Sequence, residues 1–279
     1  MANKKPRYNE IFFTQEEENK IVKLYTDGMS TVKIGKLFNV CHKTIAKVLD
    51  KHRIKRVGNG RRKYSVDENY FDVIDTPNKA YTLGFLYADG SNCMTKGTVS
   101  MSLQEEDKEI LESIRSDMKN EHPLEFIDYS NKNDFGYTYK NQYRMLICSI
   151  HICKSLEKIG MVPNKSLILQ FPEIQDNLIS HFIRGYFDGD GSVCFCSTNH
   201  NCLVTITSTE DFCLSVKDIL EKTLNIHVSI VDASNKNGIT KICTISGKNQ
   251  VKTFLEYIYK DADMYLKRKF ERYIEKYAA

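Results

Sequence analysis

The sequence predicts a mixed α/β fold of the α+β kind, in which two similar halves follow a small domain of three helices. A nine-residue phrase occurs twice, as TLGFLYADG at residues 82–90 and as IRGYFDGDG at residues 183–191. Each copy is followed by the same order of helical and alternating segments, and repetition of this kind marks a structural unit. A basic stretch separates both copies from the first fifty residues.

The repeated phrase carries a stripe of small residues. Gly84 is followed four positions later by Ala88, and Gly185 is followed four positions later by Gly189. Residues four apart lie on one face of a helix. Because small residues let another backbone approach closely, we expect the two helices to pack against each other along this stripe.

Each copy of the phrase ends in an acid, Asp89 in the first and Asp190 in the second. A carboxylate at the C-terminal end of a helix faces the negative end of the helix dipole, at a cost of about 0.3–1 kcal/mol. If the helices cross along the small-residue stripe, the two carboxylates converge, and such oxygen ligands suit Mg²⁺. The alternative is ordinary Asp-Gly turn chemistry, but its occurrence in both copies favours a cation site.

The phrase resembles the signature of the LAGLIDADG homing endonucleases, and the resemblance covers about residues 78–275. It implies two pseudo-symmetric αββαββα halves that form a saddle-shaped sheet, with the motif helices at their interface. It also implies that Asp89 and Asp190, at the eighth motif position, bind a divalent metal at the scissile phosphates. The sixth position is Asp188 in the second motif but Tyr87 in the first, which departs from the usual pattern.

The chain is long enough, at 279 residues with 41% hydrophobic content, for one large domain and a small one. Apolar runs stay well short of the roughly 18 residues that span a membrane, and the first residues are polar. We expect a soluble, intracellular protein of the cytoplasm or nucleoid. Nine cysteines, an odd number, fit reduced thiols better than disulfides.

The expected domain boundaries are 1–53 for the small domain, 54–77 for a basic linker, 78–170 for the first half and 171–279 for the second half.

The net charge of +4 is divided unevenly along the chain. Residues 1–64 hold 16 lysines and arginines against 6 acidic residues, a net charge of +10. Residues 65–279 hold 24 against 30, a net charge of −6. A basic N-terminal segment is typical of a polyanion contact, whereas the larger part of the chain must bind its partner through local placement of charge.

Three short helices are expected in the N-terminal segment, over residues 14–27, after Ser30 and over about 42–52. A tight turn between the last two resembles the helix-turn-helix of resolvase-like DNA-binding domains. The resemblance implies that the third helix enters the major groove with Lys43 and Lys47 exposed. The alternative is a small helical bundle whose lysines form a solvated face.

The stretch that follows is strongly basic and contains two glycines. Lysine or arginine occupies seven of the thirteen positions from 51 to 63. Such a segment is suited to lying along phosphates or entering a minor groove. The expected DNA contacts here are Arg53, Lys55, Arg56, Arg61, Arg62 and Lys63.

Each half is expected to contain two hairpins and two further helices after its motif helix. The first half has strands at 92–94, 98–103, 125–129 and 143–150, and helices at 107–118 and 150–159. The second half has strands at 192–197, 202–209, 227–231 and 240–246, and helices at 211–223 and 248–259. A two-stranded ribbon fits the major groove, so outward-facing residues such as Thr205 and Thr207 are expected to contact DNA.

Further site residues follow from the family resemblance. It implies a lysine beside each metal site, for which Lys165 and Lys267 are candidates, the latter chosen among Lys267, Arg268 and Lys269. The alternative is that these lysines are solvated surface residues. Gln104 and Ser208 are candidates for ordering water. The backbones of Gly90 and Gly191 can approach a metal or phosphate closely.

These observations predict a monomeric, site-specific endonuclease that cuts both strands of double-stranded DNA with Mg²⁺, or another divalent cation such as Mn²⁺. The family resemblance associates this activity with intron homing. Two alternatives keep the scaffold without cleavage: a sequence-specific DNA-binding regulator, or a maturase that binds intron RNA. Both acids are intact, which favours the enzyme, since a binder gains nothing from two carboxylates beside phosphates.

Overall fold

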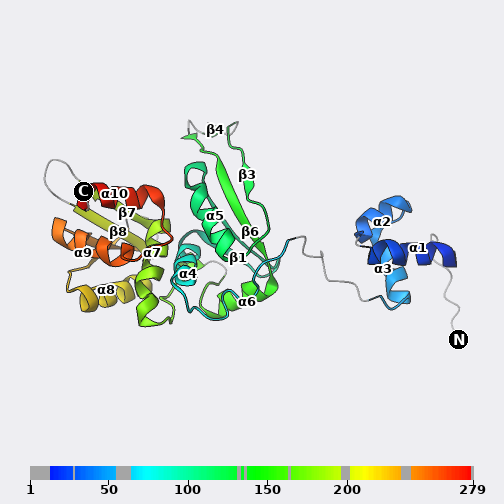
Figure 1. Cartoon of the computed structure of the whole chain (residues 1–279), viewed down its shortest axis with the longest axis horizontal. Coiled ribbons are helices and arrows are strands. Elements are labelled where there is room, and N and C mark those ends of the chain that lie inside the picture. The colour runs from blue at the N-terminus through cyan, green and yellow to red at the C-terminus, as the bar shows by residue number, and fades with distance from the viewer. Residues whose placement is uncertain are drawn as a thin grey trace. The chain divides into compact units, whose positions relative to one another are not determined.

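The computed structural model describes residues 13–27, 29–54, 64–130, 133–134, 137–162, 165–195, 202–233 and 240–277. The chain divides into two compact units, Met1–Lys63 and Tyr64–Ala279. Each unit has its own hydrophobic core, and Figure 1 shows the helices and strands of each unit. None of the described helices is long and apolar enough to cross a membrane.

The first unit contains the three expected helices, α1 (Gln15–Thr26), α2 (Thr31–Leu37) and α3 (His42–Lys51). A capping box between Thr14 and Glu17 begins α1. The three helices bury Ile21, Ile34 and Ile45 against one another, which leaves the charged faces of the helices exposed. The interpretation of this unit as a helix-turn-helix stays a prediction.

The first half of the second unit forms a four-stranded antiparallel sheet in the order β1-β2-β6-β3. Its elements are α4 (Pro77–Asp89), β1 (Gly90–Cys93), β2 (Thr98–Gln104), the short 3-10 helix η1 (Glu105–Asp107), α5 (Lys108–Asp117), β3 (Glu125–Ile127), β6 (Gln142–Cys148) and α6 (Ile150–Lys158). Two very short strands, β4 (Asn133–Asp134) and β5 (Tyr137–Thr138), pair within the loop before β6.

The second half repeats this order and forms a sheet of its own, β7-β8-β10-β9. The short 3-10 helix η2 (Lys165–Leu167) follows α6 and belongs to the first half. The elements of the second half are η3 (Asp176–Leu178), α7 (Ile179–Asp190), β7 (Gly191–Phe195), β8 (Cys202–Thr209), α8 (Glu210–Leu224), β9 (Ser229–Asp232), β10 (Thr240–Ser246), α9 (Lys248–Tyr259) and α10 (Lys267–Tyr277). The expected repeat is thus confirmed, with one four-stranded sheet in each half. The C-terminal helix α10 is an addition that the sequence pattern did not predict.

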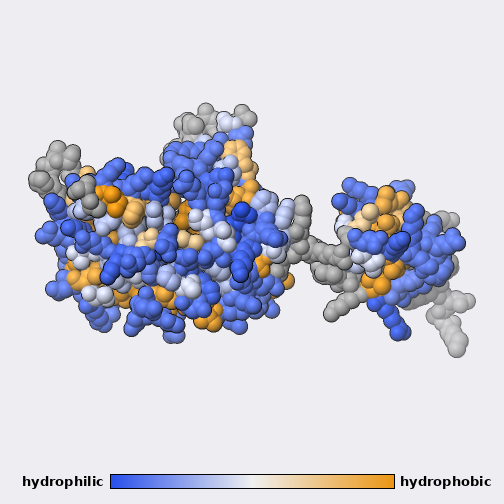
Figure 2. Space-filling model, viewed as in Figure 1, coloured by the Kyte–Doolittle hydropathy of each residue, from blue (hydrophilic) through white to orange (hydrophobic). Residues whose placement is uncertain are grey.

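Each sheet has one covered face and one uncovered face. Val99 and Met101 on β2, and Val204 and Ile206 on β8, are buried in the core that the helices share. The residues between them alternate to the other face, as expected for a strand with one side buried. The surface of this unit visible in Figure 2 is mostly hydrophilic, with small apolar areas.

The start of the second unit differs from the expected linker. Residues 64–76 were expected to belong to a linker reaching residue 77, but Tyr70 and Phe71 are buried in the core of the second unit. The Tyr70 hydroxyl contacts Thr82 at 3.3 Å and donates a hydrogen bond to Asp117. The expected boundary is therefore wrong, because this aromatic pair ties the segment to α4 and α5.

The cysteines of the described segments are free thiols. None of the eight that the structure describes forms a disulfide. Cys153 and Cys213 are fully buried in the shared core, where cysteine behaves as a small apolar residue.

Candidate active site

The motif helices α4 and α7 cross with their backbones in direct contact. A Cβ atom added to Gly84 would lie 2.1 Å from the carbonyl oxygen of Phe182, and one added to Gly185 would lie 2.0 Å from that of Tyr81. Real Cβ atoms do not approach so closely, so only glycine fits at either position. The expected packing along the small-residue stripe is confirmed.

This crossing brings the C-terminal ends of the two helices together. A Cβ atom on Gly189 would lie 2.4 Å from the Cβ of Ala88 and 3.1 Å from Oδ2 of Asp89. The first motif acid therefore lies directly against the glycine that precedes the second motif acid, Asp190. The expected convergence of the two acids follows from this packing.

Both carboxylates are exposed to solvent on one side, but protein surrounds their other sides. Loss of hydration, followed by the negative charge of Asp190, raises the pKa of Asp89 to about 6. Loss of hydration also raises the pKa of Asp190. Because burial disfavours the ionised form of both acids, and the charge of Asp190 further disfavours that of Asp89, a bound cation would stabilise the ionised pair.

A buried lysine lies beside each acid-bearing helix end. Lys165 on η2 is 8% exposed, and its Nζ donates hydrogen bonds to the carbonyls of Tyr87 and Ala88, the latter at 2.8 Å. Its loss of hydration lowers its pKa, while the charges of the two aspartates oppose that shift. A cation bonded to the last carbonyls of a helix satisfies them and complements the helix dipole.

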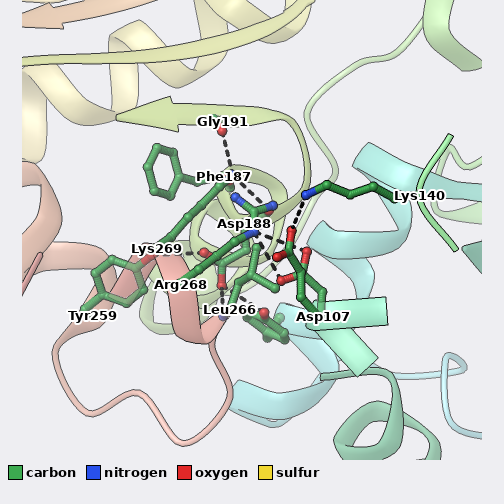
Figure 3. A network of polar contacts seen from close by, with 11 residues as sticks. Asp107, Lys140, Phe187, Asp188, Gly191, Tyr259, Leu266, Arg268 and Lys269 are labelled. Carbon is green, nitrogen blue, oxygen red and sulfur yellow. Dashed lines mark hydrogen bonds and ion pairs between the residues drawn. The ribbon is translucent and has the colours of Figure 1, made fainter. Parts of the chain in front are cut away.

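Lys269 holds the corresponding place in the second half. Its Nζ donates to the carbonyls of Phe187 at 2.6 Å, Asp188 at 2.8 Å and Gly191 at 2.5 Å (Figure 3). Burial lowers its pKa to about 8. The positive charges of Lys165 and Lys269 in turn stabilise the ionised form of both aspartates.

The candidate Lys267 is wrong as the basic neighbour of the second acid. Its side chain is 65% exposed, and its Nζ lies 3.9 Å from Glu109 on α5. Both Lys267 and Lys269 belong to α10, where a difference of two positions turns a side chain by more than half a circle. Lys269 therefore faces the motif helix and Lys267 faces solvent.

An ion pair between the two halves completes the surroundings of the acids. Nε of Arg268 lies 3.1 and 3.2 Å from the two carboxylate oxygens of Asp107 at the start of α5 (Figure 3). Asp107 is buried, and the charge of Arg268 also lowers the pKa of Asp89. Sequence reasoning missed this pair, because no local pattern links residues 161 positions apart.

The sixth motif position has an anchoring role in both halves. Asp188 is buried and accepts hydrogen bonds from the Tyr81 hydroxyl at 2.8 Å, the Tyr259 hydroxyl at 2.9 Å and the Leu266 amide at 2.7 Å (Figure 3). It thereby holds the segment that leads into α10. In the first half the Tyr87 hydroxyl donates to the carbonyl of Ile159 at 2.5 Å, next to the end of α6. Tyr87, which departs from the usual motif, therefore also anchors a following segment, but through a hydroxyl donor in place of a carboxylate acceptor.

The glycines that follow the two acids allow a close turn from helix into strand. A Cβ atom on Gly90 would lie 2.5 Å from the carbonyl oxygen of Leu86, and one on Gly191 would lie 2.5 Å from that of Phe187. The carbonyl of Gly191 also accepts a hydrogen bond from Lys269, so a cation there would compete with the lysine. A metal-binding role for either glycine stays a prediction.

The two candidates for ordering water differ in their surroundings. Ser208 is 8% exposed, and its Oγ accepts a hydrogen bond from the Tyr186 hydroxyl at 2.9 Å. Ser208 is therefore wrong for this role, because its hydroxyl points into the core. Gln104 is exposed at the end of β2 and stays a prediction.

The expected DNA contacts that the structure describes lie on exposed or partly exposed surfaces. Lys43 and Lys47 are exposed on α3, and Arg53 is exposed just after it. Thr205 and Thr207 lie on the uncovered face of the second sheet. The expected contacts Lys55, Arg56, Arg61, Arg62 and Lys63 lie outside the described residues.

The donor set at the helix junction fits a magnesium-like cation. Within the described segments, no group of three or more histidine, cysteine, aspartate or glutamate side chains is placed to hold a metal ion. Mg²⁺ is commonly held by one or two carboxylates together with water and substrate phosphates. Two solvent-facing carboxylates and no nitrogen or sulfur ligand match that pattern.

Glycine-packed helices that end in paired acids, each helix followed by an antiparallel four-stranded sheet, define the two-motif LAGLIDADG fold. Residues 177–259 match the family described as a LAGLIDADG-like domain. The match spans the second motif helix α7 and extends to the end of α9. A comparison with curated proteins gave no match.

Solved structures with this fold are similar to the chain at low sequence identity. The homing endonuclease I-WcaI bound to its DNA recognition sequence is 15% identical, with a TM-score of 0.52 over 81% of this chain and 96% of that one. I-DmoI in complex with DNA and calcium is 15% identical, with a TM-score of 0.45 over 70% and 97%. The N-terminal LAGLIDADG domain of DUF199/WhiA is 19% identical, with a TM-score of 0.43 over 69% and 89%. The likeness to I-WcaI establishes the fold.

Proposed function

We propose that the protein is a site-specific endonuclease that hydrolyses both strands of double-stranded DNA with Mg²⁺. The observation that carries the proposal is the meeting of Asp89 and Asp190 at a glycine-only helix crossing, with a buried lysine on either side. A structural role alone does not account for two acids placed together at the unfavourable ends of their helix dipoles.

Each aspartate serves one strand of the target. A divalent cation held by Asp89 and Asp190 would activate water and neutralise charge on the phosphates. The two carboxylates would be the protein ligands of that cation. Because both motif halves belong to one chain, a monomer supplies a complete site.

The buried lysines stabilise the negative charge that develops on the phosphates. Lys165 and Lys269 are fixed by backbone carbonyls, so their charges need no reorganisation during the reaction. With a pKa of about 8, Lys269 is mostly protonated at neutral pH. It therefore offers a positive charge beside the second acid.

The remaining surfaces bind the DNA on both sides of the cut. The uncovered faces of the two sheets lie along the major groove, which accepts β-ribbons. In the first unit, α3 acts as the recognition helix of a helix-turn-helix and presents Lys43 and Lys47 to the DNA. The first unit thus lengthens the recognised sequence.

The proposal is tested by incubating the purified chain with Mg²⁺ and DNA from the locus that carries its gene. The wild-type protein should give discrete double-strand fragments. Asp89→Asn and Asp190→Asn should each stop cleavage of at least one strand while binding persists, because the amide keeps the shape but not the charge. Tight binding without any cutting would instead indicate a regulator, and preference for intron RNA would indicate a maturase.

The lysine assignment has a matched control within α10. Lys269→Met should lower the cleavage rate by about 100-fold or more, as expected for the loss of one charged stabilising group. Lys267→Met should leave it near the wild-type value, because that side chain faces solvent. Equal losses in both variants, measured in single-turnover assays, would refute the assignment.

A further inference from the structure

The strand register places a charged row on the uncovered face of the first sheet. Ser102 on β2, Arg144 on β6 and Glu125 on β3 lie opposite one another in adjacent strands. The next row along the same face contains Gln104, Gln142 and Ile127. Long polar side chains therefore cluster at one end of this face.

The uncovered face of the second sheet is different. Ser192, Thr205, Thr244 and Ser229 form one row across all four strands, so every strand contributes a short hydroxyl group. The neighbouring row contains Thr207, Ile242 and Val231. Neither row carries a charge.

Arg144 is the single lysine or arginine on the uncovered faces of the strands that the structure describes. Its Nε lies 3.4 Å from Oγ of Ser102, and its Nη1 lies 3.8 Å from Oε2 of Glu125. The side chain is 44% exposed. The guanidinium group is thus oriented by two neighbours and still open to a ligand.

We infer that the two halves read DNA unequally: Arg144 selects a guanine in the half-site bound by the first sheet, and the second sheet tolerates sequence change. The inference rests on the proposed DNA binding but not on cleavage. Arginine donates two hydrogen bonds to O6 and N7 of guanine, whereas serine and threonine discriminate weakly and apolar groups contact the thymine methyl.

The acid next to Arg144 favours a contact of this arginine with a base over a contact with a phosphate. The negative charge of Glu125 beside Arg144 disfavours a phosphate at the same place. A carboxylate can accept a hydrogen bond from the amino group of cytosine. Arg144 and Glu125 together therefore suit the edge of one G·C base pair.

The experiment selects bound duplexes from a DNA pool with a randomised central segment, using the full chain with calcium in place of magnesium. The wild-type protein should enrich a guanine at one position by about 10-fold or more, and should accept several bases across the other half-site. Arg144→Gln should reduce that preference to within about 2-fold and leave the other positions unchanged. Lys140→Gln is the matched control, because Lys140 is exposed just before β6 and pairs with Glu106.

Each outcome of the selection decides the inference. An unchanged guanine preference in Arg144→Gln would overturn it, and so would a uniform loss of affinity for all sequences, which indicates a phosphate contact. Equal stringency in both half-sites would also overturn it. If the wild-type protein enriches no sequence at all, the proposed sequence-specific DNA binding fails together with the inference. A thermal melt of each variant confirms that it is folded.

Discussion

At the scale of single residues, two acids and two lysines of opposite charge lie close together at the helix junction. All four side chains have lost part of their hydration. Burial raises the pKa values of Asp89 and Asp190 and lowers those of Lys165 and Lys269. Each charge thus depends on its neighbours for its ionised state. The acids remain the more exposed members, which leaves them accessible to a cation.

The raised pKa of Asp89 predicts how stability depends on pH. The carboxyl group has an ordinary pKa of 3.8 and a folded-state pKa of about 6. The folded state then binds its proton more tightly than the unfolded chain, so this group's contribution to stability falls as the pH rises from about 4 to about 6. Without divalent ions, Asp89→Asn should raise the melting temperature by about 1–2 °C near neutral pH, with little gain near pH 4.

The measurement is a thermal melt of both proteins across this pH range, with and without Mg²⁺. Added Mg²⁺ should stabilise the wild-type protein more than Asp89→Asn, because the substitution removes a ligand. A melting-temperature difference that is the same at both ends of the pH range would contradict the prediction.

At the scale of elements, the site depends on how closely α4 and α7 approach. Gly84 and Gly185 set that distance, since a Cβ atom at either position would overlap a carbonyl oxygen of the other helix. The two lysines reach the junction from elements that follow each sheet, η2 and α10. Tyr87 and Asp188 then fix the chain segments that lead to those elements.

Substitution of one crossing glycine should separate the helices. Gly185→Ala should lower the free energy of unfolding by about 1–3 kcal/mol or more, because its Cβ would lie 2.0 Å from the Tyr81 carbonyl oxygen. Ser116→Ala on the exposed side of α5 should change it by less than about 0.5 kcal/mol. Urea unfolding measures both, and a small effect at Gly185 would mean that the helices do not pack this closely.

At the scale of the whole molecule, the excess positive charge and the paired acids of the candidate active site lie in different parts of the chain. Residues 1–64 carry a net charge of +10, whereas residues 65–279, which contain the paired acids, carry −6. The uncovered sheet faces of the described strands present one basic side chain, Arg144. Since phosphate contacts dominate non-specific affinity, the N-terminal unit should supply most of it.

The salt dependence of binding tests this division. Lys43→Gln combined with Lys47→Gln in the full chain should reduce the slope of log affinity against log salt by about 2, since each phosphate contact contributes about 0.9. Lys154→Gln combined with Lys158→Gln, exposed on α6, is the matched control and should leave the slope unchanged. An unchanged slope in the first variant, measured on duplex DNA of arbitrary sequence, would place the phosphate contacts elsewhere.

The element order, the repeat, the helix crossing and the pair of acids could be predicted from the sequence. These features depend on local patterns, namely the alternation of apolar and polar residues, helix caps, and small residues four apart on a helix. Because the same pattern occurs in both copies of the repeated phrase, each copy supports the interpretation of the other. Gly84 and Gly185 lie at the helix crossing, and Asp89 lies against Gly189, as expected from the small-residue stripe.

Which other side chains reach those acids could not be predicted, because it depends on contacts between distant segments of the chain. Lys269 instead of Lys267 faces the site, Ser208 points into the core, and Arg268 pairs with Asp107 in the other half. Each of these side-chain positions is set by the path of a segment far away in the sequence. The direction of a side chain at the start of α10 depends on how Asp188 anchors Leu266, and no short pattern records that contact.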